Sequence, residues 1–258
     1  MDMTPEDRAR LNFAKELLEN PGLAARLTSF VGMPFEKAFD YLPAKWNDSI
    51  RKIAEKSLRH ALGLALKTIN QDQGKSSSDS LHKFLVAASG GMGGAFGLPS
   101  LALELPLTTV VIFRSIADIA RSEGEDIMSI QARLACLEVF ALGGGSRQDN
   151  AAESGYFAIR AVLGSQVSEA AKYVLERGMA AEGAPALVKL IATIASRFGV
   201  TVSQKAAASA IPVIGAAGGA LINSIFMDHF QNMARGHFIV RGLERKYGVD
   251  LVRDRYCR

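Results

Sequence analysis

The sequence predicts an all-α protein, and three observations lead to this prediction. Of the 258 residues, 48% are hydrophobic but only 7% are aromatic, and the chain is rich in alanine and contains 24 glycines. Alanine favours helices, whereas strands favour aromatic and β-branched residues. Apolar residues recur at three- and four-residue steps in several segments, as they do on the buried face of an amphipathic helix. We therefore expect a bundle of closely packed helices.

The composition also excludes several classes of protein. Charged residues make up 22% of the chain beside abundant apolar residues, which is unlike a disordered protein. Two cysteines, Cys136 and Cys257, are too few for a disulfide scaffold and indicate a reducing compartment. The first ten residues are polar and acidic, so we expect no secretory signal.

Helix-capping residues place the first elements. Thr4 precedes Pro5 and two acids, which predicts a helix from there to about residue 20. A long amphipathic helix is expected over residues 44–69, because apolar residues recur there with a helical period. Further helices are expected at residues 127–142, 152–176, 184–198 and 202–210.

A polar stretch, QDQGKSSSDS at residues 71–80, has the composition of a linker. It predicts an N-terminal helical arm over residues 1–70 and a main helical domain over residues 81–258.

Two long uncharged runs stand out in the main domain. Residues 84–103 form a run of 20, and Glu104 is the only charge as far as residue 113; residues 206–227 form a run of 22. Each run is long enough to span a membrane, yet glycines and prolines interrupt both. Small residues suit helices whose backbones touch. We expect both segments to pack at the centre of the bundle, with insertion of 84–113 and 206–227 into a bilayer as the alternative.

The helices after the two runs end alike. Residues 119–126 and 243–250 both read apolar-x-Arg-x-x-Gly-x-Asp, with Gly124 and Gly248 placed as C-terminal capping glycines. The likeness reflects either a duplicated helical unit or the convergent use of helix-ending residues.

Positive charge gathers in two places. Residues 44–68 carry six Lys or Arg against two Asp or Glu, and residues 235–258 carry seven against three. Such patches suit phosphate or anionic lipid, and they also serve as ordinary solubilising faces. The residues expected to contact lipid or another anion are Lys45, Arg51, Lys52, Lys56, Arg59, Arg253 and Arg255.

Motifs for catalysis and cofactor binding are missing. Gly74-Lys75-Ser76 lacks the earlier glycine of a phosphate loop, the cluster at residues 90–97 fails the dinucleotide pattern, and neither G-x-S-x-G nor H-E-x-x-H occurs. No metal, cofactor or nucleic-acid partner is expected, and the histidines are expected at exposed or helix-terminal positions.

Charges in or beside the apolar segments form the weak catalytic candidates. Arg114 and Asp118 are spaced to pair on one helix face, as are Asp118 and Arg121. Such a group is either a structural ion pair or a polar functional site. The candidate catalytic residues are Glu104, Arg114, Asp118, Asp228 and His229.

The same stretches resemble the EcsC protein family. The first stretch that shows the likeness is GGMGGAFGLP at residues 90–99, followed by Leu-Pro-Leu at 105–107 and the helix 113–120 ending at Gly124. The second stretch is residues 211–215 with the helix ending RGLERKYG at 241–248. The likeness covers the chain from about residue 40 onward. The family takes its name from a bacterial protein encoded beside an ABC transporter, and a peptidase-like label is sometimes attached to it.

The resemblance and the charge pattern together predict a membrane-associated accessory protein. We expect it in the cytoplasm, peripheral to the inner membrane, where it binds anionic lipid or a membrane partner such as a transporter. The alternative is a hydrolase or peptidase with its site in the bundle. A helical adaptor that binds a protein through residues 1–42 is a third hypothesis.

Overall fold

The computed structural model is all-α in the part of the chain that it describes, as the sequence predicts. The described residues are 2–19, 22–32, 37, 39, 42, 46–67, 101–143, 155–177, 184–211 and 215–258. In chain order the helices are α1 (Pro5–Glu19), α2 (Leu23–Val31), α4 (Trp46–Lys67), α6 (Leu101–Ser122), α7 (Ile130–Leu142), α8 (Gly155–Arg177), α9 (Pro185–Ser209), α10 (Gly215–Tyr247) and α11 (Val249–Cys257).

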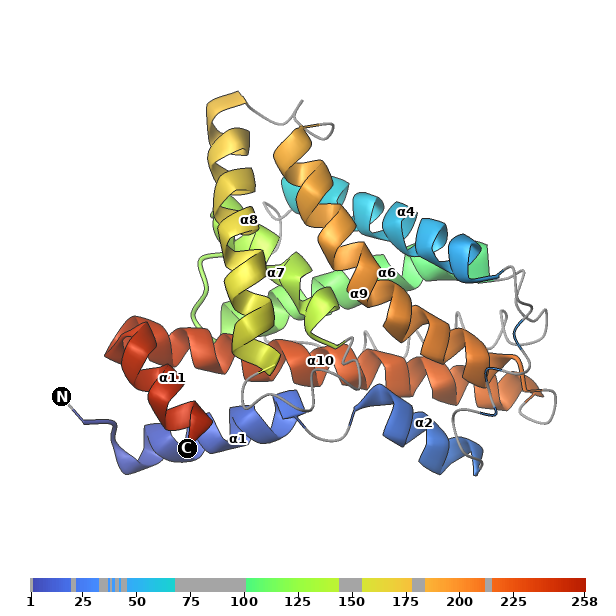
Figure 1. Cartoon of the computed structure of the whole chain (residues 1–258), viewed down its shortest axis with the longest axis horizontal. Coiled ribbons are helices and arrows are strands. Elements are labelled where there is room, and N and C mark those ends of the chain that lie inside the picture. Colours follow the sequence, from blue (N-terminus) through green and yellow to red (C-terminus); the bar gives the residue numbers. More distant parts are fainter. Residues whose placement is uncertain are drawn as a thin grey trace.

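Helix α10 is the spine of the molecule. With 33 residues it is about 50 Å long at 1.5 Å per residue. Figure 1 shows α1 and α2 running along one side of α10, while α7, α8, α9 and α4 extend from the other side. Helices α1, α2, α6, α7, α9 and α11 all pack directly against it. Because six helices contact it, most of the described side chains of α10 are buried or partly buried.

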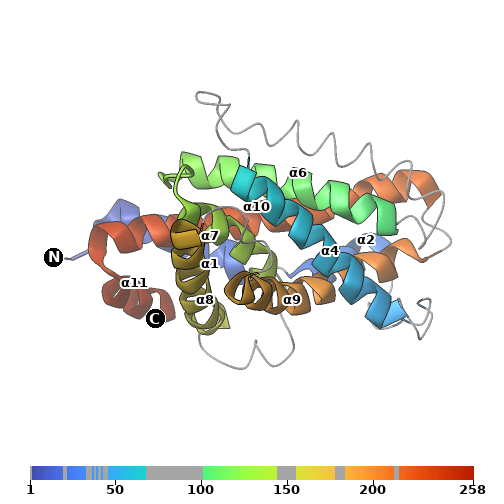
Figure 2. The ribbon, with the colours of Figure 1, turned by 90° about the horizontal axis from the view of Figure 1, so that it is seen from above.

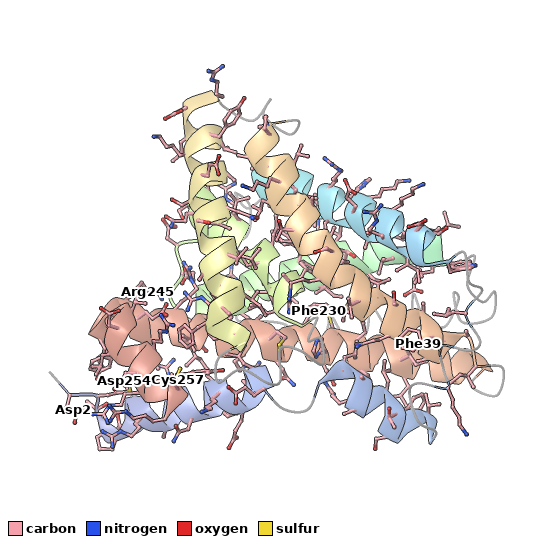
Figure 3. The ribbon with its side chains drawn as sticks, in the orientation of Figure 1. Asp2, Phe39, Phe230, Arg245, Asp254 and Cys257 are labelled. Atoms are coloured by element: carbon pink, nitrogen blue, oxygen red, sulfur yellow. The ribbon has the colours of Figure 1, made fainter. Side chains whose placement is uncertain are left out.

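An aromatic cluster fills the core where α7, α9 and α10 meet. The rings of Phe140 and Phe198 are 5.0 Å apart, and Phe230 lies 5.2 Å from Phe140 and 5.7 Å from Phe198. Figure 3 shows Phe230 at this junction. Edge-on and tilted ring pairs of this kind add to the stabilisation that burial of the rings supplies.

The N-terminal helix closes onto both C-terminal helices. Leu11 and Ala14 of α1 are buried against α10. The Asp7 carboxylate accepts hydrogen bonds from Lys246 Nζ at 2.6 Å and from the Tyr247 hydroxyl at 2.8 Å. Lys15 Nζ donates to a main-chain carbonyl of α11. Figure 3 shows Asp2 close to Asp254 and Cys257 of α11.

Helix α4 has one apolar face, and that face is buried. It packs against α6 and α9, as Figure 2 shows from above. The fully buried residues on this face are Ile50, Ala54, Ser57, Leu58, Ala61 and Ala65. The predicted arm therefore shares one continuous core with the later helices. The predicted linker at 71–80 lies outside the described residues, and the domain boundary stays a prediction.

Helix α9 corrects one sequence expectation. Separate helices were expected at 184–198 and 202–210, but α9 continues through Gly199 and ends at Ser209. A glycine inside a helix lowers its stability without ending it when packing holds the flanking turns. Buried Phe198 and Val202 supply that packing on either side of Gly199.

Among the described helices, α9 is the one long and apolar enough to span a membrane. More than half of its most apolar window is buried inside the protein, as in a core helix of a water-soluble fold. This is weak evidence for a span.

The uncharged runs are described only in part. Residues 84–100 lie outside the described residues, so the central packing of the first run stays a prediction. The described part of the second run forms the end of α9 and the start of α10, where Ala206, Ile222 and Phe226 are buried. The predicted capping glycines are confirmed, because Gly124 and Gly248 have φ of 82° and 87°.

Close contact between α1 and α10 makes Gly236 a sensitive position. An added Cβ there would lie 2.7 Å from Leu18 Cγ and 2.9 Å from the Ala14 carbonyl oxygen. We expect Gly236→Ala to lower the free energy of unfolding by about 2 kcal/mol in urea titrations. The matched control is Gly164→Ala in α8, where an added Cβ meets nothing within 4 Å. That variant should gain about 0.5–1 kcal/mol. Equal effects of the two substitutions would contradict this packing.

Candidate functional site

The outer side of α4 carries a group of exposed cations. Arg51, Lys52, Lys56 and Arg59, which we call the α4 basic face, are all exposed. Arg59 Nη2 pairs with Glu55 Oε1 at 2.7 Å, one turn earlier on the same helix. In Figure 3, nitrogen-tipped side chains stand out from the outer side of α4. The helix thus presents a net positive surface to solvent.

The C-terminal arginines form a separate site. Arg253 is exposed on α11, while Arg255 Nη2 pairs with Asp2 Oδ1 at 3.1 Å. Helices α4 and α11 lie at opposite ends of the molecule in Figures 1 and 2. The two groups of cations are therefore far apart on the molecule. Lys45, the remaining predicted contact residue, lies outside the described residues.

Glu104 is the centre of a buried polar cluster. Its Oε1 accepts hydrogen bonds from Lys205 Nζ at 2.6 Å, Asn223 Nδ2 at 2.8 Å and Thr108 Oγ1 at 3.3 Å. These residues come from α6, α9 and α10, so the cluster ties three helices together. The Lys205 ammonium also lies 5.0 Å from the centre of the Phe226 ring.

The electrostatics of this cluster favour an ion pair. Burial acts to raise the pKa of Glu104, but the Lys205 ammonium and the three hydrogen bonds outweigh it, so the pKa falls below its ordinary value. Burial lowers the pKa of Lys205, and Glu104 opposes that shift. Sequence reasoning missed Lys205, although a signal was present. Glu104 ends the first uncharged run and Lys205 immediately precedes the second.

The other candidates on α6 lie far from this cluster. Asp118 pairs with Arg121 at 3.0 Å, as the i,i+3 spacing predicts, and Arg114 is exposed. Fourteen residues of helix separate Glu104 from Asp118, which is about 21 Å along the axis. The two carboxylates are therefore too far apart to act on one bond.

Asp228 and His229 make structural contacts on α10. Asp228 Oδ2 pairs with Arg26 at 3.2 Å, and the imidazole Nε2 of His229 lies 3.2 Å from the Gly143 carbonyl oxygen. Burial lowers the pKa of His229 to about 4, so the ring is neutral at pH 7. An added Cβ at Gly143 would meet this ring at 2.3 Å, which explains the glycine.

The expectation of exposed histidines is wrong for both histidines of α10. His229 is 3% exposed and His237 is fully buried. His237 belongs to a second polar network that sequence reasoning also missed. Its Nδ1 lies 3.0 Å from the Tyr156 hydroxyl, and its Nε2 lies 3.7 Å from Glu138 Oε2. In the sequence, Glu138 is a lone acid within an apolar helix, where charge needs an explanation.

Among the described residues, no group of three or more His, Cys, Asp or Glu side chains is arranged to hold a metal ion. Cys136 is buried, as expected for a core residue, and burial raises the pKa of its thiol far above the ordinary value. Cys257 is partly exposed on α11.

These features define an all-α protein with two buried polar networks and a basic outer helix. The chain belongs to the EcsC protein family, which it matches over residues 9–243. The match begins earlier than the expected residue 40 and takes in most of α1. No curated protein and no solved structure matched the chain.

The ion pair between Glu104 and Lys205 can be tested by a double-mutant cycle. Lys205→Met leaves a buried carboxylate unpaired, so we expect the free energy of unfolding to fall by about 3 kcal/mol. Glu104→Gln combined with Lys205→Met removes both charges and should recover much of this loss. Urea denaturation measures all the variants. Additive effects of the two substitutions would contradict the pairing.

Proposed function

We propose that this protein is a non-enzymatic accessory protein that binds an anionic membrane surface through the α4 basic face. Helix α4 is divided into two faces, and this division supports the proposal. Its apolar face is buried against α6 and α9, whereas Arg51, Lys52 and Lys56 are exposed and have no ion-pair partner among the described residues. This arrangement leaves the charges available to a partner.

Membrane electrostatics set the expected strength of this contact. Each Lys or Arg near an anionic surface contributes about 1 kcal/mol. Asp48 and Glu55 on the same helix reduce the net charge, and Glu55 occupies Arg59. The contact is therefore weak and reversible, and the protein would concentrate at the membrane without being anchored there.

The buried face of α4 also sets the mode of binding. Amphipathic helices that insert into the interface place their apolar side among the lipid chains. In this protein the corresponding side, which includes Ile50, Leu58 and Leu62, already belongs to the core. Binding through α4 is therefore a surface contact between charges, and salt should weaken it.

The family resemblance implies a setting in the cytoplasm beside the inner membrane, and it supports that location for this protein. The family is named after a protein encoded beside an ABC transporter, and that association is consistent with a role at the membrane surface. We propose that its partner is a membrane transport protein. Binding of the α4 basic face to the membrane would bring the EcsC-family protein close to that partner.

Vesicle flotation with matched charge variants tests the proposal. We expect the protein to float with phosphatidylcholine vesicles that contain phosphatidylglycerol, to stay behind with phosphatidylcholine alone, and to dissociate as salt rises. Substitution of Arg51, Lys52 and Lys56 by Gln removes about 3 kcal/mol, which should weaken binding about 100-fold.

The control carries the same charge change elsewhere. Substitution of Lys172, Arg177 and Lys189 by Gln removes three exposed cations from α8 and α9 and should leave binding within about threefold of the original. Equal losses in the two triple variants would show that only net charge matters. Binding that persists at high salt would contradict a surface contact.

A further inference from the structure

Helices α7, α8 and α10 enclose two titratable side chains that face each other. Glu138 Oε2 lies 3.7 Å from His237 Nε2, and the two side chains are 4% and 0% exposed. His237 Nε2 is buried without a hydrogen bond. The other ring nitrogen lies 3.0 Å from the Tyr156 hydroxyl. The pair therefore holds ionisable atoms in an interior that water does not reach.

The cations nearest to this pair are already engaged. Arg160 binds Glu244 through two hydrogen bonds of 2.7 and 2.9 Å. Arg241 binds Glu125 in the same two-point manner. The charged groups that act on Glu138 are Glu125 after α6, Arg160 on α8 and Arg241 on α10. The further titratable or charged groups next to the pair or to these residues are Cys136 on α7, Tyr156 on α8, Glu244 on α10, Tyr256 on α11, and Arg197 on α9, which donates to the Ala141 carbonyl of α7.

Burial favours the neutral form of both members of the pair. It raises the pKa of Glu138 to about 7, and Arg241 and Arg160 offset only part of that shift. Burial together with the same two arginines holds the pKa of His237 well below its ordinary value. Below about pH 7 the contact is thus between a neutral acid and a neutral ring. Loss of the Glu138 proton places a carboxylate there that the two arginines compensate only in part.

The pair is connected to the C-terminal helix through stacked rings. The Tyr156 ring stacks on Tyr256 of α11 at 5.6 Å, and Phe157 meets Tyr256 edge-on at 5.1 Å. Tyr256 is 1% exposed, so it anchors α11 in the core. A shift of Tyr156 away from His237 would remove the ring on which Tyr256 stacks.

We propose that Glu138 and His237 form a buried site for a single proton that locks the first turns of α8 and, through Tyr156 and Tyr256, α11 onto α10. When the proton is bound, the junction is uncharged and the rings stay stacked. When it is lost, the Glu138 carboxylate draws water or a cation into the junction, and the contacts of α8 and α11 loosen. The site makes the docking of α11 depend on pH.

Hydrogen exchange of the full chain, compared with Glu138→Gln, tests the lock. The folded pKa lies above the ordinary 4.5, so the stabilisation is fully present below that value and is lost as the pH rises through about 7. In the original protein, exchange protection of α11 and of the start of α8 should fall on the order of tenfold between about pH 6 and about pH 8.5, after correction for intrinsic rates. Glu138→Gln, which cannot ionise, should keep its protection.

The control is Glu169→Gln, which changes an exposed acid on α8 and should follow the original protein. A second measurement needs no variant: the side-chain carboxyl carbon of Glu138, followed by NMR in the original protein, should titrate with a midpoint near pH 7. A midpoint near the ordinary value of 4.5 would overturn the proposal. So would equal loss of protection in the original protein and in Glu138→Gln.

Discussion

The packing of six helices against α10 is the constraint on which the rest of the structure depends. Most of the middle of α10 is shielded from water, so the polar side chains buried there need hydrogen-bond partners. The contacts that satisfy them are Asn223 with Glu104 of α6, His229 with the Gly143 carbonyl after α7, Gln231 with Ser115 of α6, and His237 with Tyr156 of α8. Each of these four polar residues of α10 thus contacts one neighbouring segment.

This use of polar groups separates the interior from the surface. The carboxylates and histidines that looked like catalytic candidates are largely committed to holding helices together, as Glu104 and His229 show. The apolar face of α4 is committed in the same way. The exposed side of α4 carries a row of cations. A role for this helix in recognition therefore depends on charge at the surface. The buried Glu138–His237 pair adds a device that responds to protons without any contact with a ligand.

Much of the fold follows from local pattern, whereas the polar networks do not. The helical period predicted the helix at 44–69, and it is found at Trp46–Lys67. Capping glycines predicted the ends at Gly124 and Gly248. The pairing of Glu104 with Lys205 joins residues 101 positions apart, and spacing along one helix carries no information about such a contact. His237 was expected at an exposed or helix-terminal position, because the sequence does not show whether a lone histidine has a buried partner such as Tyr156.

We propose that α4 meets a membrane by charge alone while it stays docked on the core. An environment-sensitive dye at Lys52→Cys, in a Cys257→Ser background, measures this directly, with the dye at Lys172→Cys on α8 as the control. With anionic vesicles, the dye on α4 should report the headgroup region, salt should abolish the signal, and the dye on α8 should not respond. A dye response that reports the lipid chains, or an equal response at both positions, would contradict the account.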